Sequence, residues 1–474
     1  MDQGIPTVEE GDPQGDPALS GLDPALRRKP AGRKPKPTID SARAALHAAG
    51  SAQKAFPWLT RSFAALPDPR RQDMCRYSSA HIWWSGTLLF LTRAGSRNAF
   101  DQARNSGAAP CNMGAFCGQG PDDPRFEGEP TITCSDNLAH HLRRIEPTAV
   151  QRIAEDMVAD LLPRRVLDSA RLLDSWYLLV VDGTVQELCR QGFEAGGKSG
   201  GKGGARYRYV LQCGLLGPHN TFFPLLHEHV DLHDPQTQKE DCELRAFTRL
   251  AQRLKQRFPR LRFCIIGDAL FCTEAIAELC AEHQWKYVLT LKEGRQPTLW
   301  AEVLALLPLA PENTLRTRTG QDGKAGLRDF RWVENLPLGR HTCTAVLAGE
   351  ITAAAATLYV YATNFLISKD RVEPIISATG RQRHLIEDYF NTAKNNGVGL
   401  EHVFCADATA SKNFFTLMQI AWTLWNFICH GSLTRLFGWA ARATQKALAQ
   451  AIAEGMRSRL FPPLLPVPGQ FRFG

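Results

Sequence analysis

The order of the elements predicted between residues 172 and 292 constrains the fold more than any other feature of the sequence. Their patterns predict strand, strand, strand, helix, strand, helix and strand over residues 176–181, 206–216, 221–230, 235–257, 262–267, 273–283 and 286–292. Strands that alternate with helices in this way form a mixed α/β sheet with covering helices.

Two aspartates stand where apolar strands of this sheet end. Asp182 follows residues 176–181 in VVDG, and Asp268 follows residues 262–267 in IIGD. Ends of neighbouring strands can hold two carboxylates a few ångströms apart, and hard divalent cations bind through such oxygens. A single aspartate at a strand end is more often a turn former, and the two together leave the turn and the metal interpretations equally open.

A helical pattern over residues 373–396 carries a third carboxylate. Arg383, Glu387 and Lys394 are spaced four and seven residues apart, so their side chains share one face of the helix. An exposed ion pair would explain this spacing in an isolated helix. Beside two strand-end aspartates, the same face favours a cation site flanked by groups that hold phosphates.

The chain divides by pattern into six predicted segments. We expect a disordered acidic and basic tail (1–41), followed by a helical N-terminal domain that binds DNA (42–165). The α/β core then comes in two parts (166–300 and 373–432, the second with the Glu387 helix), separated by a β-rich insertion (301–372). A C-terminal helix and tail (433–474) end the chain. An apolar helix at 411–430 is expected to be buried.

Composition is consistent with a soluble, cytoplasmic protein that meets a polyanion. The 474 residues include 56 Lys and Arg against 48 Asp and Glu, giving a net charge of +8, so nucleic acid is the first partner to consider. The 13 cysteines have no repeating spacing and predict reduced thiols. The acidic N-terminus lacks the pattern of a signal peptide, and no membrane partner is expected.

Three motifs together resemble the DDE transposases of bacterial insertion sequences. They are VVDGT around Asp182, IIGDALF around Asp268, and R-x3-E-x6-K at Arg383, Glu387 and Lys394. The resemblance covers residues 170–430 and is strongest to the insertion-sequence-four superfamily. It implies a ribonuclease H-like mixed sheet with flanking helices, interrupted by a β-rich insertion before the catalytic Glu and preceded by a helical N-terminal domain.

The resemblance also implies an activity and a set of ligands. Asp182, Asp268 and Glu387 would be the catalytic residues and would bind Mg²⁺, with Mn²⁺ as an alternative ion, while Arg383 and Lys394 would bind DNA phosphates. The partners would be double-stranded DNA, as transposon ends and as target, and a second copy of the chain.

One signature position departs from the family. The signature is Tyr-x2-Arg-x3-Glu-x6-Lys, and Gly380 stands at the Tyr position. This departure removes a contact to the transposon end, for which Tyr389 and Tyr207 are candidate replacements.

A Gly/Lys segment offers a competing interpretation. Residues 192–199 match the phosphate-binding pattern G-x4-G-K-S, but a β-type run follows where that site needs a helix. We therefore expect no nucleotide cofactor, and we interpret the segment as a loop that touches the DNA backbone. Its candidate contacts are Lys198, Lys202, Arg206 and Arg208.

Other clusters and functions remain open. Cysteines 111, 117 and 134 with histidines 140 and 141 miss the tight spacing of structural zinc sites. His227, His229 and His233 suit a sheet edge as well as a metal site. Functionally, the alternatives are a nuclease of the same fold that lacks strand transfer, and a catalytically inactive DNA-binding descendant.

Overall fold

The computed structural model describes residues 39–190, 193, 198–199, 205–230, 242–319, 326–351, 356–432, 434, 444–462 and 473. The predicted disordered tail therefore lies outside the described residues, except for its last three positions. The same holds for Lys202, for His233 and for the predicted helix start at Asp234-Pro235.

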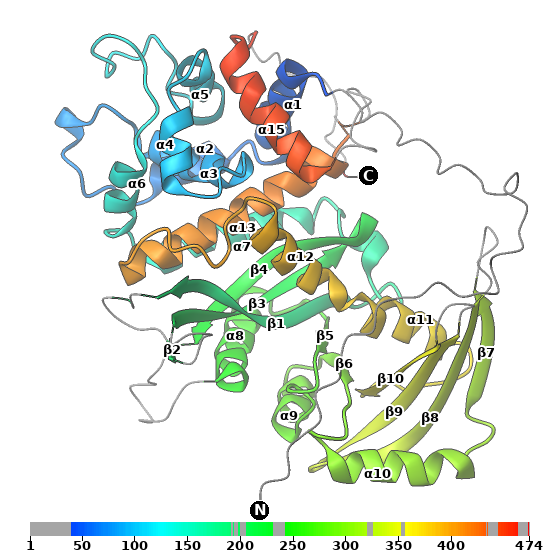
Figure 1. Cartoon of the computed structure of the whole chain (residues 1–474). Coiled ribbons are helices and arrows are strands. Elements are labelled where there is room, and N and C mark those ends of the chain that lie inside the picture. Colours follow the sequence, from blue (N-terminus) through cyan, green and yellow to red (C-terminus); the bar gives the residue numbers. More distant parts are fainter. Residues whose placement is uncertain are drawn as a thin grey trace, which may run out of the picture. The chain divides into compact units, whose positions relative to one another are not determined.

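A mixed sheet of ten strands forms the centre of the described structure (Figure 1). The strand order is β2-β3-β1-β5-β6-β10-β9-β8-β7, and β4 pairs with β3. The strands are β1 Tyr177–Cys189, β2 Lys198–Ser199, β3 Arg206–Gly217, β4 Thr221–Val230, β5 Phe263–Gly267, β6 Lys286–Thr290, β7 Thr314–Thr319, β8 Gly326–Leu338, β9 His341–Ile351 and β10 Ala356–Thr363. β1, β5 and β6 run parallel, whereas β3 and β10 are antiparallel to their neighbours. The predicted α/β class with a mixed sheet is confirmed.

The β-rich insertion continues the same sheet. Its last strand, β10, pairs with β6 of the core, with Tyr361 opposite Thr290. Helix α10, Pro297–Leu306, lies before these strands and packs on β8. The sequence analysis did not predict this helix, because its apolar residues lack a clear one-sided period.

Helices cover both faces of the core strands. Figure 1 shows α7 (Pro147–Leu161), α12 (His384–Asn395) and α13 (Ala408–His430) on one side, and α8 (Glu243–Arg257) on the other. Helix α9 is Glu274–Glu282, and Thr273 caps it by accepting the Ile276 N–H. Helix α13 is almost entirely buried, as predicted for the apolar segment at 411–430.

The helix predicted over residues 373–396 is broken. It consists of α11 (Val372–Ala378), a 3₁₀ turn η8 (Gly380–Gln382) and α12. Thr379 has φ −115° and ψ −82°, which interrupts the helical hydrogen bonding between the two pieces. Helix α12 therefore begins as a separate helix after the 3₁₀ turn and does not continue α11.

The remaining helices pack around α13 and share its core. They are α1 Ser41–Ala55, α2 Leu59–Ala65, α3 Ser79–Leu91, α4 Arg97–Ala103, α5 Ala109–Cys117, α6 Ser135–Leu142 and α15 Gln445–Ser458, with 3₁₀ turns at Gln72–Met74, Asp168–Ala170, Pro218–Asn220 and Leu307–Leu309. Helices α1 and α15 touch so closely that a Cβ at Gly455 would lie 1.8 Å from the Ser41 carbonyl oxygen. A single hydrophobic cluster runs from Ala44 to Met456.

Two further properties concern the described part of the chain. No helix there combines the length and the apolar character needed to cross a membrane. All 13 cysteines are free thiols.

Candidate active site

Asp182 and Asp268 lie side by side because of the register of two parallel strands. β1 pairs with β5 so that Val180 is opposite Ile266. Asp182 comes two residues after Val180, and Asp268 comes two residues after Ile266. Side chains two residues apart point to the same face of a strand, so both aspartates point to the face that Val180 and Ile266 share. Adjacent strands are about 4.8 Å apart, which brings the two carboxylates within reach of one ligand.

Backbone contacts fix one oxygen of each carboxylate. Asp182 Oδ1 accepts the Gly183 N–H at 2.9 Å, and Asp268 Oδ1 accepts the Leu270 N–H at 2.9 Å in the turn after β5. Asp268 therefore has the turn-forming role considered for it. The prediction that a strand ends at Asp182 is wrong, because β1 continues through Asp182 to Cys189 and keeps its pairing with β3.

Arg383 connects the third carboxylate to the first. Its Nη1 lies 3.5 Å from Asp182 Oδ2, and its Nη2 donates to Glu387 Oε1 one turn along α12. The Asp182 side chain is 20% exposed, and that of Glu387 is 49% exposed. We call Asp182, Asp268, Glu387 and Arg383 the acidic site.

The electrostatics of Asp182 record an excess of negative charge. Burial raises the pKa of Asp182 to about 6, and the charges of Asp268 and Glu387 add to the increase. Arg383 and the hydrogen bond from Gly183 oppose the shift without cancelling it. Two of the three carboxylates, those of Asp182 and Glu387, thus share the Arg383 guanidinium.

The donor set fits a hard divalent cation in its chemistry. Carboxylate oxygens are the ligands that Mg²⁺ prefers, and the charge excess favours a cation. In the present conformation, no group of three His, Cys, Asp or Glu side chains among the described residues is arranged around a metal position. To form a group of three ligands with Asp182 and Asp268, the Glu387 carboxylate would have to leave Arg383 and turn toward the ion.

Tyr209 and Glu243 border the site and were missed by the sequence analysis. A Cβ at Gly183 would lie 2.4 Å from the Tyr209 hydroxyl, which donates to Glu243 Oε1 at 2.8 Å. Burial and Glu243 raise the pKa of Tyr209 well above its usual range, and Asp182 and Asp268 contribute. The glycine after Asp182 was the available signal, because it permits this close approach.

The other predicted phosphate-binding residues lie in different surroundings. Lys394 Nζ is 2.8 Å from Glu401 Oε1, and its side chain is 30% exposed. Arg206 is exposed on β3. Lys198 lies in the short strand β2.

Arg208 is committed to interior contacts. Its Nη1 lies 2.7 Å from Glu187 Oε2, its Nη2 donates to the Ala406 carbonyl at 2.7 Å, and its side chain is 11% exposed. This placement argues against the predicted contact with DNA phosphates.

The candidate replacements for the signature tyrosine differ in position. Tyr389 is buried, with its ring 5.0 Å from that of Phe222 and 4.6 Å from that of Trp422 between centroids. It therefore belongs to the core. Tyr207 lies on β3 opposite Leu188, with its ring 6.3 Å from that of Tyr209.

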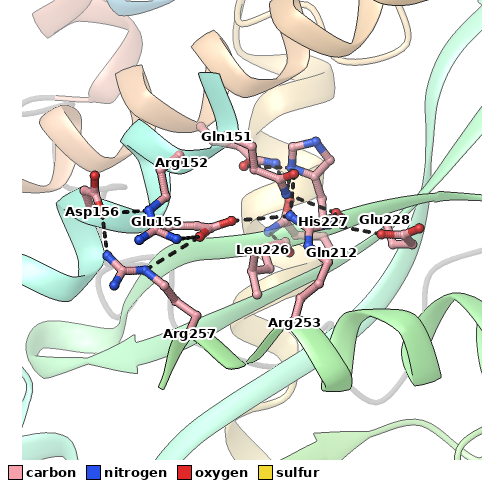
Figure 2. Close-up of polar contacts among 11 residues, drawn as sticks. Gln151, Arg152, Glu155, Asp156, Gln212, Leu226, His227, Glu228, Arg253 and Arg257 are labelled. Atoms are coloured by element: carbon pink, nitrogen blue, oxygen red, sulfur yellow. Dashed lines mark hydrogen bonds and ion pairs between the residues drawn. The ribbon is translucent and has the colours of Figure 1, made fainter. Parts of the chain in front are cut away.

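His227 belongs to a second cluster of polar groups, where α7 and α8 meet β4 (Figure 2). Its Nδ1 is 3.3 Å from Gln151 and 3.2 Å from Gln419, and burial lowers its pKa to about 3. We call the charged members of this cluster the arginine network, which consists of Arg152, Glu155, Asp156, Glu228, Arg249, Arg253 and Arg257. A small cavity of about 310 Å³ lies against it.

Comparison with known protein families identifies the middle of the chain. A family model described as Transposase DDE domain matches residues 177–424, which is slightly more than half of the chain. The match begins at β1 and ends within α13, so it includes all four residues of the acidic site. No curated protein sequence matches the chain.

Proposed function

The chain belongs to the transposase DDE domain family, whose members catalyse DNA transposition, and from this premise we propose its specific reaction. It binds the terminal inverted repeats of an insertion sequence, cleaves the phosphodiester at each transposon end, and joins the freed 3′ hydroxyl to target DNA. The insertion-sequence-four superfamily is its proposed subgroup. It acts as a homodimer in the bacterial cytoplasm, since two ends must be processed together.

The observation that carries this proposal is the convergence at the acidic site. The β1–β5 register supports a pair of ligands from Asp182 and Asp268, and the two contacts of Arg383 support Glu387 as the third. Elements far apart in sequence supply these groups, and all fall inside the matched segment.

The three carboxylates are proposed to hold Mg²⁺ or Mn²⁺. When bound, such ions supply activation of the attacking water or 3′ hydroxyl and stabilise the leaving oxygen. The backbone hydrogen bonds to Asp182 and Asp268 hold one oxygen of each carboxylate and so restrict the orientation of the side chain. This orientation lowers the cost of assembling the site.

Arg383 and Lys394 are proposed to position phosphates. The planar guanidinium of Arg383 presents paired donors that match a phosphodiester, whereas Lys394 supplies a point charge. The side chains of Arg383 and Lys394 are 24% and 30% exposed, so both are accessible to a phosphate. Lys198 on β2, Arg206 on β3 and Lys202, which lies outside the described residues, remain proposed contacts to the DNA backbone.

Labelled end DNA, incubated with a supercoiled target plasmid and Mg²⁺, tests the proposal. The expected result is cleaved ends together with labelled plasmid that carries covalently joined ends. Cleavage without joining would assign the chain to the nucleases of this fold. Binding without cleavage would identify an inactive descendant.

A further inference from the structure

The turn before α12 is packed directly against one tyrosine ring. A Cβ at Gly380 would lie 2.4 Å from Cε1 and 2.5 Å from Cζ of Tyr361. Gly380 is not among the glycines with a positive φ, so lack of space, rather than backbone conformation, requires glycine there. Its side-chain space is filled by a ring from β10.

The surroundings of Tyr361 hold this ring in place. Tyr361 is 3% exposed, and it lies in the middle of the sheet between Thr290 on β6 and Val346 on β9. Its ring stacks on that of Tyr359, with centroids 6.3 Å apart and planes 15° apart. A ring in the interior of a close-packed sheet cannot give way to a new side chain without cost.

The residue after Gly380 is held by the same strand. The Arg381 guanidinium lies 4.7 Å from the centroid of Tyr359, and its Nη2 donates to Glu350 Oε2 at 2.5 Å. The two tyrosines of β10 therefore contact two consecutive residues of the turn.

Arg383, which directly follows the turn, connects it to the acidic site. Arg383, three residues after Gly380, is the N-cap of α12 and makes the ion pairs to Asp182 and Glu387. Glu387 follows one turn later on the same helix. A displacement of the turn consequently moves both side chains relative to Asp182 and Asp268.

We propose that Tyr361 is a positioning residue for the acidic site, whose ring and the backbone of Gly380 form a steric lock that sets where α12 begins. The lock fixes the direction in which Arg383 and Glu387 approach Asp182 and Asp268. This inference rests on the proposed catalytic role of the acidic site.

Four variants of the full-length chain test the lock: Tyr361→Ala, Tyr361→Phe, Gly380→Ala and the double alanine variant. The cleavage rate at saturating end DNA should fall about 100-fold in each single alanine variant, since misplacement by about 1 Å costs that much. Tyr361→Phe retains the ring and should stay within about 3-fold of the wild type. The affinity for end DNA should not change in any variant.

The double variant separates a lock from two independent defects. Removing the ring makes room for the new Cβ, so Gly380→Ala should cost at least 10-fold less in the Tyr361→Ala background than alone. Rates that multiply instead would overturn the proposal. A folded Gly380→Ala enzyme that cleaves like the wild type would also overturn it, whether or not Tyr361→Ala folds.

Two controls assign the cause of any failure. Phe258→Ala removes a buried ring that packs on Phe263, at the end of β5 remote from Asp268, and it should lower stability while leaving the cleavage rate unchanged. Glu387→Gln should be inactive. If Glu387→Gln cleaves normally, the proposed function fails; if it is inactive while Gly380→Ala is normal, only the lock fails.

Discussion

The acidic site and the arginine network differ in how they balance charge. In the arginine network, three carboxylates face four guanidinium groups, and each acid has an arginine partner within 4 Å. In the acidic site, Asp182 and Glu387 share Arg383, and the charge of Asp268 adds to theirs. Both clusters join a helix to the same sheet, so their surroundings are comparable.

This difference indicates which cluster needs an external cation. Burial raises the pKa of Glu155 in the arginine network, while Arg253, Arg152 and Arg257 all lower it. Around Asp182, two neighbouring acids act in the same direction as burial. A balanced network stabilises the fold by itself, whereas an unbalanced one is a candidate functional site.

Removing one acid from each cluster should give the largest difference in cleavage rate between them. Glu387→Gln should reduce cleavage of end DNA by about 10³-fold or more, because it removes a proposed cation ligand without changing the size of the side chain. The matched variant Glu228→Gln, in the arginine network, should keep cleavage within about 3-fold, since the ion pairs of this acid with described residues are to Arg249 and Arg253, outside the acidic site. Rates are measured on labelled end DNA, and equal losses in both variants would remove the distinction between the clusters.

Stability should respond in the opposite way. Arg253→Gln removes the cation that most strongly opposes the effect of burial on Glu155, whose side chain is 9% exposed, and it should lower the free energy of unfolding by about 2 kcal/mol. Denaturant titration measures this loss, and the cleavage rate of the folded variant provides the control. A variant as stable as the wild type would show that these ion pairs contribute nothing to the fold.

The pH dependence of folding stability should also distinguish the acidic site, by a smaller effect. Asp182 has a pKa of about 6 in the folded chain, against an ordinary value of 3.8, so the folded state holds this proton more tightly than the unfolded chain does. Stability from this group is present below pH 4 and is lost as pH rises through 6.

Asp182→Asn should therefore stabilise the ion-free protein at pH 8 by about 1 to 2 kcal/mol and have no such effect near pH 4. Thermal unfolding with a chelator present, at several pH values, measures this difference. A stabilisation that is the same at both pH values would exclude the titration of Asp182 as its cause.

The sequence predicted the parts of the site that depend on local pattern. Asp268 was found because an apolar strand ends just before it, and Asp182 because it follows an apolar run, although β1 continues past it to Cys189. Arg383 and Glu387 were found by helical spacing. These signals need only a few neighbouring residues.

What the sequence did not predict depends on partners distant along the chain. The burial of Arg208 depends on Glu187 on a neighbouring strand, and the close packing of Gly380 depends on the ring of Tyr361 on β10. The pairing of β10 with β6 makes the insertion part of the core sheet, which no local period reveals. Tyr209 was missed for the same reason, since its contact with Gly183 joins two strands.

Anomalous diffraction from Mn²⁺-soaked crystals of the protein bound to end DNA tests the central claim most directly. We expect a manganese peak between the carboxylates of Asp182 and Asp268, within about 2.3 Å of an oxygen of each, with Glu387 turned from Arg383 toward the ion. Manganese bound elsewhere, with Glu387 still paired to Arg383 beside bound DNA, would contradict the account.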